Sequence, residues 1–522
     1  MPRSRLTASA VLALSVGLLS SACTTSSGPE GAGASGPAGA GTIRYGVTSD
    51  VSTFDPAKAT AATEYTFARL TYATLVGRDN GGKIIPQLAR TWKATPTSAT
   101  FTLREDLTCS DGSPLTAGQV AASLRRYADP RKGSSSSGLV FGPGGTPEIT
   151  ADDRARTVSV ELAKPWSDLV PGLALPVTGI VCAPGLEDLT ALAKGSVEGA
   201  ATGGYTLTKA QRGTSYTFER RKEYAAWPPY EQQPEGEPAD TFAVFVVGNE
   251  STLANQVSTG ALDYAPFTGP DATRFQGGEW RTKTAPILRM YLVLNEREGH
   301  PGADPEVRRA VAQAVDAAAY NKVHGGRGEL MKSFADSSAP CVNTDASLLT
   351  GHDPAAAKKV LTGIPLKITG TNAIAGGAGN DYVQEVLRSA GAKTELRNVD
   401  NATWATEVLG GKGDWDVTVM AHLNLSGTLT NAAPLLSGQA PPAGRNFGDV
   451  QNPGFVEAFG RAMATVDEEE KCANWRSAQK ALLERNDVVP LATVPVTYVL
   501  RKNIDGAMAM GFIDPTTLRV SH

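Results

Sequence analysis

The order of strand-rich and helix-rich segments constrains the fold of this chain most. Short segments of alternating apolar and polar residues fill the first half, and 99–104 is one of them. Near residues 291–295 the sequence becomes helix-rich, and the last strands, over 488–500, again look like those of the first half. A chain that leaves one lobe, builds a second and then returns crosses between the lobes twice. We therefore expect large α/β lobes joined by a hinge over a cleft.

Helix-start signals and chain length agree with this organisation. Thr116 and Gln119 form a capping-box pattern, and Asp304 followed by Pro305 can begin another helix. The 522 residues exceed what one hydrophobic core usually serves, so two or more lobes are expected.

The first 22 residues have the features of an export signal. Arg3 and Arg5 are the only charges before Glu30, and they precede an apolar stretch, 6–19. That stretch is too short for a membrane span of about 20 residues. Small residues follow it and end at Ala22, as at a cleavage site. We expect residues 1–22 to be a signal peptide.

Cleavage after residue 22 makes Cys23 the first residue and a candidate for lipid attachment. The segment resembles a bacterial lipoprotein signal, although Ser20 stands where Leu is usual, and this departure leaves ordinary secretion open. Residues 23–41 are rich in Gly, Ser, Ala and Pro, a composition that forms a flexible tether. We expect a globular body anchored by lipid at the extracellular face of the cell membrane.

Cysteine usage fits an oxidising compartment. Apart from Cys23, the chain has Cys109, Cys182, Cys341 and Cys472, an even set that allows three pairings. We favour Cys109–Cys182 and Cys341–Cys472, because each bond then stays within one half of the chain. Buried free thiols are the alternative.

The residue patterns give little support for an enzyme. GRDNGGK at 77–83 has the spacing of a phosphate-binding loop, but Ile84 replaces the Ser or Thr that magnesium needs. No GxSxG, HExxH or CxxC motif is present, and the five histidines lack metal-ligand spacing. The net charge of −4 argues against nucleic acid as a partner. We expect no catalysis, no metal and no cofactor, with a secreted hydrolase as a remote alternative.

Several stretches, taken in order, resemble the solute-binding protein family 5 of ABC importers, the oligopeptide-, dipeptide- and nickel-binding proteins. These stretches are Ile43-Arg-Tyr-Gly-Val, Thr53-Phe-Asp-Pro56, YATLVGRDNGGKIIPQLARTWKA (72–94), TFTLREDLTCSDGSPLTAGQVAASLRRY (100–127), TGGYTLTKAQRGTSYTFERRKEY (202–224) and DPEVRRAVAQAVDAAAYNKVHGG (304–326). The resemblance runs from about residue 42 to the C-terminus, and the cysteine pattern is similar to that of actinobacterial members.

The resemblance implies an α/β fold, a two-lobed periplasmic-binding-protein-like clamshell of type II, cluster C-like. Lobe 1 would span 42–290 with an extra subdomain at about 72–200, lobe 2 would span 291–485, and 486–522 would return to lobe 1. The motif at 77–83 becomes a β-turn between strands. The implied function is an extracytoplasmic solute-binding lipoprotein, a monomer that captures a peptide or peptide-like solute by hinge closure and delivers it to ABC permease subunits.

The ligand is the open question. Peptide binders of this family usually hold the peptide ammonium with an Asp of the second lobe, and the equivalent stretch here is WDVTVMAHLNLSGTLTNAAP (415–434). Between Asp416 and Asp449 there is neither Asp nor Glu. A buried ammonium without a carboxylate is costly, so a short peptide with a free N-terminus is in doubt. A modified peptide, a nickel chelate, a siderophore or another natural product remains open.

Candidate ligand residues follow from position and residue type. Thr53 and Phe54 come after the first strand, where the family's cleft wall lies. Trp404 and Trp415 can line an apolar pocket of the second lobe. The polar candidates are Asn295, His422, Asn424 and Arg445.

Overall fold

The computed structural model describes residues 41–79, 81–129, 131–134, 137–424, 426–509 and 511–521. The expected signal peptide, the expected lipid site at Cys23 and the expected tether up to residue 40 lie outside these ranges. Within them, no helix has both the length and the apolar character that a membrane span requires.

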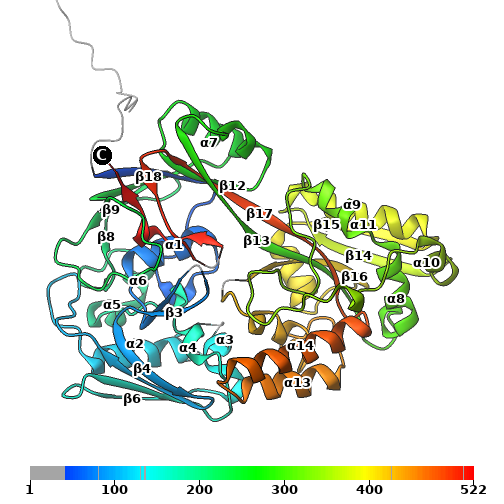
Figure 1. The fold of residues 1–522 in the computed structure, drawn as a ribbon, viewed down its shortest axis with the longest axis horizontal. Helices are drawn as coiled ribbons and strands as arrows, with labels where there is room; N and C mark the ends of the chain where they lie inside the picture. Colours follow the sequence, from blue (N-terminus) through cyan, green and yellow to red (C-terminus); the bar gives the residue numbers. More distant parts are fainter. Residues whose placement is uncertain are drawn as a thin grey trace, which may run out of the picture. The chain divides into compact units, whose positions relative to one another are not determined.

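One ten-stranded sheet runs through the described body (Figure 1). Its strands, in spatial order, are β15 (Lys393–Val399), β14 (Pro365–Thr371), β16 (Val417–Leu423), β13 (Trp280–Leu294), β17 (Val489–Arg501), β12 (Tyr264–Phe267), β1 (Thr42–Val47), β11 (Thr241–Val246), β9 (Ser215–Arg220) and β8 (Tyr205–Gln211). We use "lobe 1" for residues 42–279 with 502–521, and "lobe 2" for residues 295–488. The expected boundary at 290 falls inside β13, and the one at 485 falls just before β17.

Strands β13 and β17 join the two lobes. They pair antiparallel over most of their length, from Trp280 opposite Arg501 to Leu292 opposite Val489. On the lobe 1 side β12 pairs with β17, and on the lobe 2 side β16 pairs with β13. The register shifts twice, between 286 and 288 and between 289 and 291, where lobe 1 partners give way to lobe 2 partners. Bulges interrupt the ladder, bend the strand and increase its twist, so the strand geometry is irregular where the two lobes meet.

Lobe 1 also contains a four-stranded antiparallel sheet. Its order is β4 (Ala89–Thr95), β5 (Ser98–Leu103), β7 (Thr157–Glu161) and β6 (Glu148–Asp152). In β5, Ala99, Phe101 and Leu103 are buried and alternate with more exposed residues, as the sequence pattern predicts. Helix α2 (Ala117–Ala128) packs on this sheet and begins with the predicted capping box, in which the Gln119 N–H donates to Thr116 Oγ1 at 3.3 Å.

The remaining elements of lobe 1 are short. They are α1 (Ala62–Thr71), α3 (Ser137–Phe141), α4 (Leu169–Gly172), α5 (Ala183–Glu187), α6 (Leu189–Lys194), α7 (Glu250–Ser258), β2 (Val76–Arg78), β3 (Ile84–Pro86), β10 (Glu237–Pro238), β18 (Ile504–Asp505), β19 (Met508–Ala509), β20 (Phe512–Ile513) and β21 (Arg519–Val520). The 77–83 motif forms the turn between β2 and β3, which pair antiparallel. This is the β-turn that the family resemblance implies.

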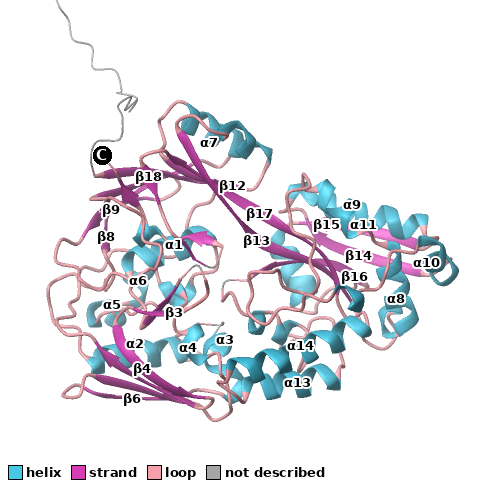
Figure 2. Cartoon of the chain, viewed as in Figure 1, coloured by secondary structure: helices cyan, strands magenta, loops and turns pink. Residues whose placement is uncertain are grey.

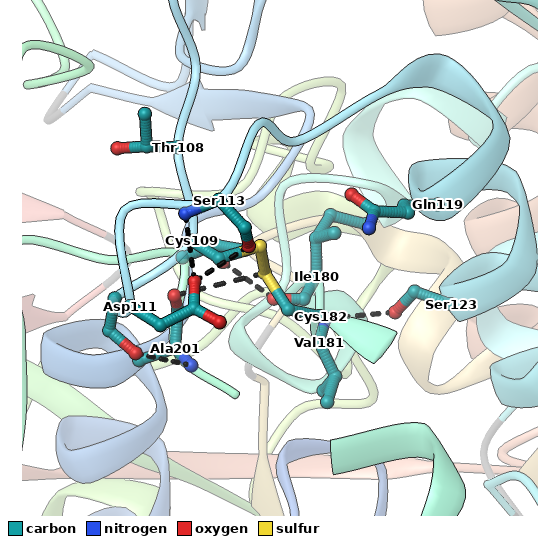
Figure 3. Close-up of a disulfide and its surroundings, with 12 residues drawn as sticks. Thr108, Cys109, Asp111, Ser113, Gln119, Ser123, Ile180, Val181, Cys182 and Ala201 are labelled. Atoms are coloured by element: carbon teal, nitrogen blue, oxygen red, sulfur yellow. Dashed lines mark hydrogen bonds between the residues drawn. A yellow bond between two sulfur atoms is a disulfide. The ribbon is translucent and has the colours of Figure 1, made fainter. Parts of the chain in front are cut away.

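A disulfide between Cys109 and Cys182 fastens the segment after α4 to the segment before α2 (Figure 3). Both cysteines are fully buried. The hydroxyl of Ser123, on α2, accepts the Val181 N–H at 2.9 Å beside the bond. Covalent and hydrogen-bonded links therefore act on the same short segment.

Helices surround the lobe 2 strands (Figure 2). They are α8 (Pro305–Ala314), α9 (Ala317–Val323), α10 (Pro354–Leu361), α11 (Ala378–Ser389), α12 (Asn401–Trp404), α13 (Pro453–Met463) and α14 (Glu468–Glu484). Helix α8 starts at the predicted cap, where the Asp304 carboxylate accepts the Glu306 N–H at 2.9 Å. A second disulfide, Cys341–Cys472, ties a loop to α14. Both disulfides have the pairing that we favoured from the sequence.

Two buried carboxyl groups lie where the chain leaves β13 and enters β17. Each of Glu296 and Asp487 lies within 3.5 Å of both Arg308 and Arg485. Burial and the negative charge of Asp487 raise the pKa of Glu296, and burial also raises the pKa of Asp487. The pair therefore holds a proton more tightly than two separate, exposed carboxyl groups do.

Candidate functional site

A cavity of about 470 Å³ lies between lobe 1 and lobe 2. Lobe 1 contributes Thr60, Tyr65, Tyr127, Leu139, Leu175, Pro176 and Val177 to its wall. Lobe 2 contributes Ala405, Leu409, Met420, His422, Leu423, Ser426, Asn431, Leu435 and Arg445. The volume is that of a site for a small molecule, and both lobes must be in place to form it.

The chemistry of the wall is apolar with a few polar groups. Tyr65 and Tyr127 supply aromatic surface from lobe 1, and Met420 supplies a thioether from lobe 2. Among the described residues that line the cavity, none is Asp or Glu. The cavity is therefore suited to an apolar or aromatic body that carries hydrogen-bonding groups, and it provides no anionic partner for a ligand cation.

His422 is a polar side chain that the protein itself leaves unsatisfied. It lies on β16 opposite Arg289 of β13, and its exposed fraction is only 5%. Neither ring nitrogen has a hydrogen-bond partner among the described residues, because the nearby Asn431 amide is directed at the Leu423 carbonyl and at Asn424. Burial, reinforced by the positive charge of Arg289, lowers the pKa of His422 to about 3. At neutral pH the ring is uncharged and offers one donor and one acceptor.

Arg445 is the cation of the cavity wall. Its side chain is exposed, and it forms neither an ion pair nor a hydrogen bond with any described residue. A guanidinium group presents donors in a planar fork that fits a carboxylate or a pair of carbonyl oxygens. The site thus combines a free cation, a neutral imidazole and no anion.

Comparison with known proteins identifies the kind of protein that carries this cavity. The family model described as "Bacterial extracellular solute-binding proteins, family 5 Middle" matches residues 83–431. The chain belongs to this family.

Individual relatives agree with the family assignment. A substrate binding protein from Microbacterium hydrocarbonoxydans, solved in complex with 4-hydroxybenzoate hydrazide, is 36% identical with a TM-score of 0.80, and the match covers 92% of this chain and 100% of that one. The glutathione-binding protein GsiB of Escherichia coli K12 is 25% identical over 493 residues, which cover 89% of this chain and 91% of GsiB. DppA from Helicobacter pylori, in complex with the peptide STSA, is 19% identical with a TM-score of 0.74 over 92% of this chain and 98% of that one, a likeness in fold.

The family membership confirms three expectations from the sequence. The chain is a family 5 solute-binding protein, it has a mixed α/β fold of the two-lobed kind, and it serves ABC transporters. It binds a peptide or small-molecule substrate and works with ABC transporter permeases, and its relatives are extracytoplasmic transport proteins and not enzymes.

The two tryptophans expected in the pocket of this family 5 protein pack elsewhere. Trp404 is buried on α12, and its Nε1–H donates to Thr418 Oγ1 at 3.0 Å. Trp415 is fully buried against Phe447, with 5.9 Å between the ring centroids. Neither residue lines the cavity. The α12 region reaches the cavity through Ala405, one residue after Trp404.

The two asparagines expected as polar anchors lie behind the cavity wall. The Asn295 side-chain amide donates to the Trp415 carbonyl at 2.9 Å, and its oxygen accepts from Arg297. Both ends of the side chain are therefore engaged within the protein. Asn424 is buried and accepts from the Ser426 hydroxyl at 3.2 Å. Ser426, its partner, is the residue that lines the cavity.

Thr53 and Phe54 belong to the core of lobe 1. Thr53 Oγ1 accepts the Asp55 N–H at 3.1 Å. Phe54 packs against Phe67 and Tyr216, with ring centroids 5.9 and 5.5 Å apart. It borders a separate cavity of about 410 Å³ within lobe 1. Of the candidates from the sequence, the structure brings together only His422 and Arg445 in the cavity between the lobes.

Several residues of the site escaped the sequence analysis. Met420 lies two residues before His422 on β16, so strand alternation applied from His422 indicates it. Tyr127 is a buried aromatic residue near the end of α2, and no local sequence pattern marks its contact with the cavity. Tyr65 and the residues near Pro176 reach the cavity through long-range packing of lobe 1, for which the sequence contains no local signal.

Proposed function

We propose that this family 5 protein captures a small peptide-like or aromatic acyl compound that lacks a free ammonium group. The compound binds between the lobes and is delivered to permease subunits in the membrane. The observation that carries the proposal is the acid-free cavity wall, in which Arg445 and His422 are the unpaired polar groups.

The charges of the site explain the choice of ligand. A free ammonium enclosed here loses its hydration and meets Arg445, a like charge, with no carboxylate in the wall. A ligand carboxylate or acyl oxygen instead accepts from the Arg445 guanidinium, and a ligand donor or acceptor satisfies His422. Acylation of the amine removes the unfavourable charge and adds a carbonyl acceptor.

The ligands of relatives support this direction. The Microbacterium hydrocarbonoxydans protein was solved with 4-hydroxybenzoate hydrazide, a phenol ring that bears an acyl hydrazide. An aromatic ring of this size suits a wall of Tyr65, Tyr127 and aliphatic side chains. Glutathione, which GsiB binds, is a peptide with a free ammonium group, so it supports only the peptide-like part of the proposal.

Capture proceeds by closure of the lobes, and export places the protein outside the cell. The register shifts in β13 and β17 supply the bending point, and both lobes contribute wall residues, so closure encloses the ligand. A signal peptide over 1–22 and a lipid on Cys23 keep the monomeric protein at the extracellular face of the membrane, beside the permease.

The decisive experiment identifies the solute directly. Purified protein is denatured, and the released small molecules are identified by mass spectrometry. A compound with an acyl group or carboxylate and no free primary amine is the expected result.

Calorimetry then tests the charge argument. Trialanine, N-acetyl-trialanine and 4-hydroxybenzoate hydrazide are compared, and we expect N-acetyl-trialanine to bind at least as well as trialanine. Arg445→Ala should weaken carboxylate ligands more than tenfold, about 1.4 kcal/mol. Arg309→Ala, which removes an exposed arginine of α8 away from the cavity, is the matched control. Tight binding of trialanine that is lost on acetylation would overturn the proposal.

A further inference from the structure

The turn at 77–83, which sequence analysis assigns no chemistry, presents a buried arginine. The Asp79 carboxylate accepts the Lys83 N–H at 2.9 Å, and the Asp79 carbonyl accepts the Gly82 N–H at 3.1 Å, which closes the turn. The Gly82 carbonyl then accepts from Arg78 Nε at 2.9 Å. The Arg78 side chain is 3% exposed. The turn therefore fixes the direction of a guanidinium that water scarcely reaches.

The other hydrogen bonds of Arg78 cross to lobe 2. Its Nη1 donates to the Ser426 carbonyl, and its Nη2 donates to the Gly427 carbonyl at 3.3 Å. No carboxylate among the described residues forms an ion pair with it. Two of the three groups that satisfy this buried cation thus belong to the opposite lobe, in the segment directly after β16.

Asp168 makes a matching contact at the other end of the same segment. It is 3% exposed, at the start of α4 in lobe 1. Its carboxylate accepts from the Thr430 hydroxyl and from the ammonium of Lys471 on α14, both in lobe 2. Burial alone raises the pKa of Asp168, but Lys471 and Thr430 outweigh it and hold the pKa below its usual value. The carboxylate is ionised and depends on lobe 2 for its partners.

The neighbours of Asp168 rest on the same face of lobe 2. The Ser167 N–H donates to the Met463 carbonyl at 3.1 Å, and Trp166 packs edge-on against Phe459 of α13 at 6.0 Å. Figure 1 shows α4 beside α13 and α14. The contact is therefore a packed junction that positions the Asp168 carboxylate.

The segment held from both ends, residues 426–431, forms part of the cavity wall. Ser426 and Asn431 both line the cavity, and Thr430 lies between them. When the lobes separate, Arg78 loses two of its three acceptors and Asp168 loses both of its donors. Either group then needs water to replace protein partners.

We propose that Arg78 and Asp168 are positioning residues of lobe 1 that fix the 426–431 segment when the lobes close. In this geometry the 426–431 segment is held in place only when the lobes are closed. Lobe 1 therefore helps to shape the lobe 2 wall that encloses the solute. This role rests on the proposed function in one respect, namely that the solute occupies the cavity between the lobes.

Hydrogen exchange of the full protein tests the proposal without knowledge of the solute. Exchange at residues 426–431 is measured by mass spectrometry in the protein as purified and again with excess N-acetyl-trialanine. Arg78→Gln and Asp168→Asn should each accelerate exchange there by at least about fivefold, while β14 stays unchanged. Arg90→Gln, which removes an exposed arginine on β4 of the same lobe, should match the wild type.

Two further variants keep the test decisive if a lobe 1 variant fails to fold. Lys471→Met leaves lobe 1 untouched and should reproduce the effect of Asp168→Asn. Arg78→Lys keeps the charge but lacks the planar fork, and should give intermediate exchange. Wild-type exchange in all the variants, or unprotected exchange at 426–431 in the wild type under both conditions, would overturn the proposal.

Affinity separates this inference from the proposed function. Where N-acetyl-trialanine binds the wild type, Arg78→Gln should weaken it by about tenfold or more, and Arg90→Gln should not. If the wild type does not bind this probe, the proposed ligand class fails, while the exchange result on the purified protein still decides the role of Arg78 and Asp168.

Discussion

Two contributions to the stability provided by each disulfide, loop entropy and core packing, rank the two bonds in opposite orders. Removing the disulfides one at a time separates these contributions. The loop closed by Cys341–Cys472 spans 131 residues and that closed by Cys109–Cys182 spans 73. In the chain-entropy model these loops contribute about 5 and about 4.4 kcal/mol. On loop length alone, Cys341–Cys472 is the stronger bond by about 0.5 kcal/mol.

Packing reverses the order when the sulfur atoms are removed as well. Cys109 and Cys182 are both 0% exposed, whereas Cys341 and Cys472 are half-buried. A void of methyl size in a closed core costs about 1 kcal/mol, so two buried sulfurs add about 2 kcal/mol to the Cys109–Cys182 variant. The neighbouring Gln479 also holds the Cys341 loop, because its side-chain amide donates to the Cys341 carbonyl at 2.9 Å. The net expectation is that Cys109→Ala with Cys182→Ala costs about 1.5 kcal/mol more than the other double variant.

The assay is urea denaturation followed by tryptophan fluorescence, with the free energy of unfolding obtained by linear extrapolation. Each double-alanine variant is compared with the wild-type protein in oxidised form and after full reduction. Selective reduction of the Cys341–Cys472 bond in a Cys109→Ala, Cys182→Ala background, and the reciprocal experiment, measure loop entropy with the sulfur atoms still in place. A larger loss from Cys341→Ala with Cys472→Ala than from the buried pair would refute the packing argument.

Four other predictions concern the lipid anchor, closure, catalysis and the pH dependence of stability. A diacylglycerol-sized mass on Cys23 is expected in membrane-extracted protein, and Cys23→Ser should release the protein into the medium; equal retention of that variant would contradict lipid anchoring. X-ray scattering should show compaction when the solute is added, and the pure protein should hydrolyse neither peptides nor ATP. Because the folded state raises the pKa of Glu296, the folded protein binds a proton that the unfolded chain releases, so this stabilisation is complete below about pH 4.3 and is lost as the pH rises. Glu296→Gln should flatten the fall in unfolding free energy between pH 5 and 8, and an unchanged slope would contradict the coupling to Asp487.

Local sequence patterns predicted individual helices and strands, while the family resemblance implied the two-lobed clamshell. Thr116 with Gln119 and Asp304 with Pro305 begin helices in the structure because a capping interaction involves residues close in sequence. The change of character near 291 falls near the end of β13, a strand that ends at Leu294. The even set of cysteines allowed three pairings, and the two halves of the chain were enough to choose among them.

The cavity was harder to predict because residue type does not reveal which surface a side chain faces. Trp404 and Trp415 have the aromatic rings that a pocket needs, yet both are buried in the core, where Trp404 contacts β16 and Trp415 packs against Phe447. The side-chain amide of Asn295 could hydrogen-bond a ligand, but in the fold it donates to the Trp415 backbone carbonyl. His422 and Arg445 are polar residues between Asp416 and Asp449, where the sequence has no acidic residue, whereas Tyr65 reaches the wall only through long-range packing of lobe 1.

The position of β17 has a consequence for the order in which the protein is made and folded. This strand lies in the middle of the ten-stranded sheet, between β12 and β13, but it is the last long strand to be synthesised. A nascent chain that ends before residue 489 has every other strand of that sheet, and a gap where the two lobes must join. Strands β12 and β13 each lack one partner until β17 has been made, so the two halves of the sheet are joined last. The last long strand to be made is therefore the one that closes the sheet between the two lobes.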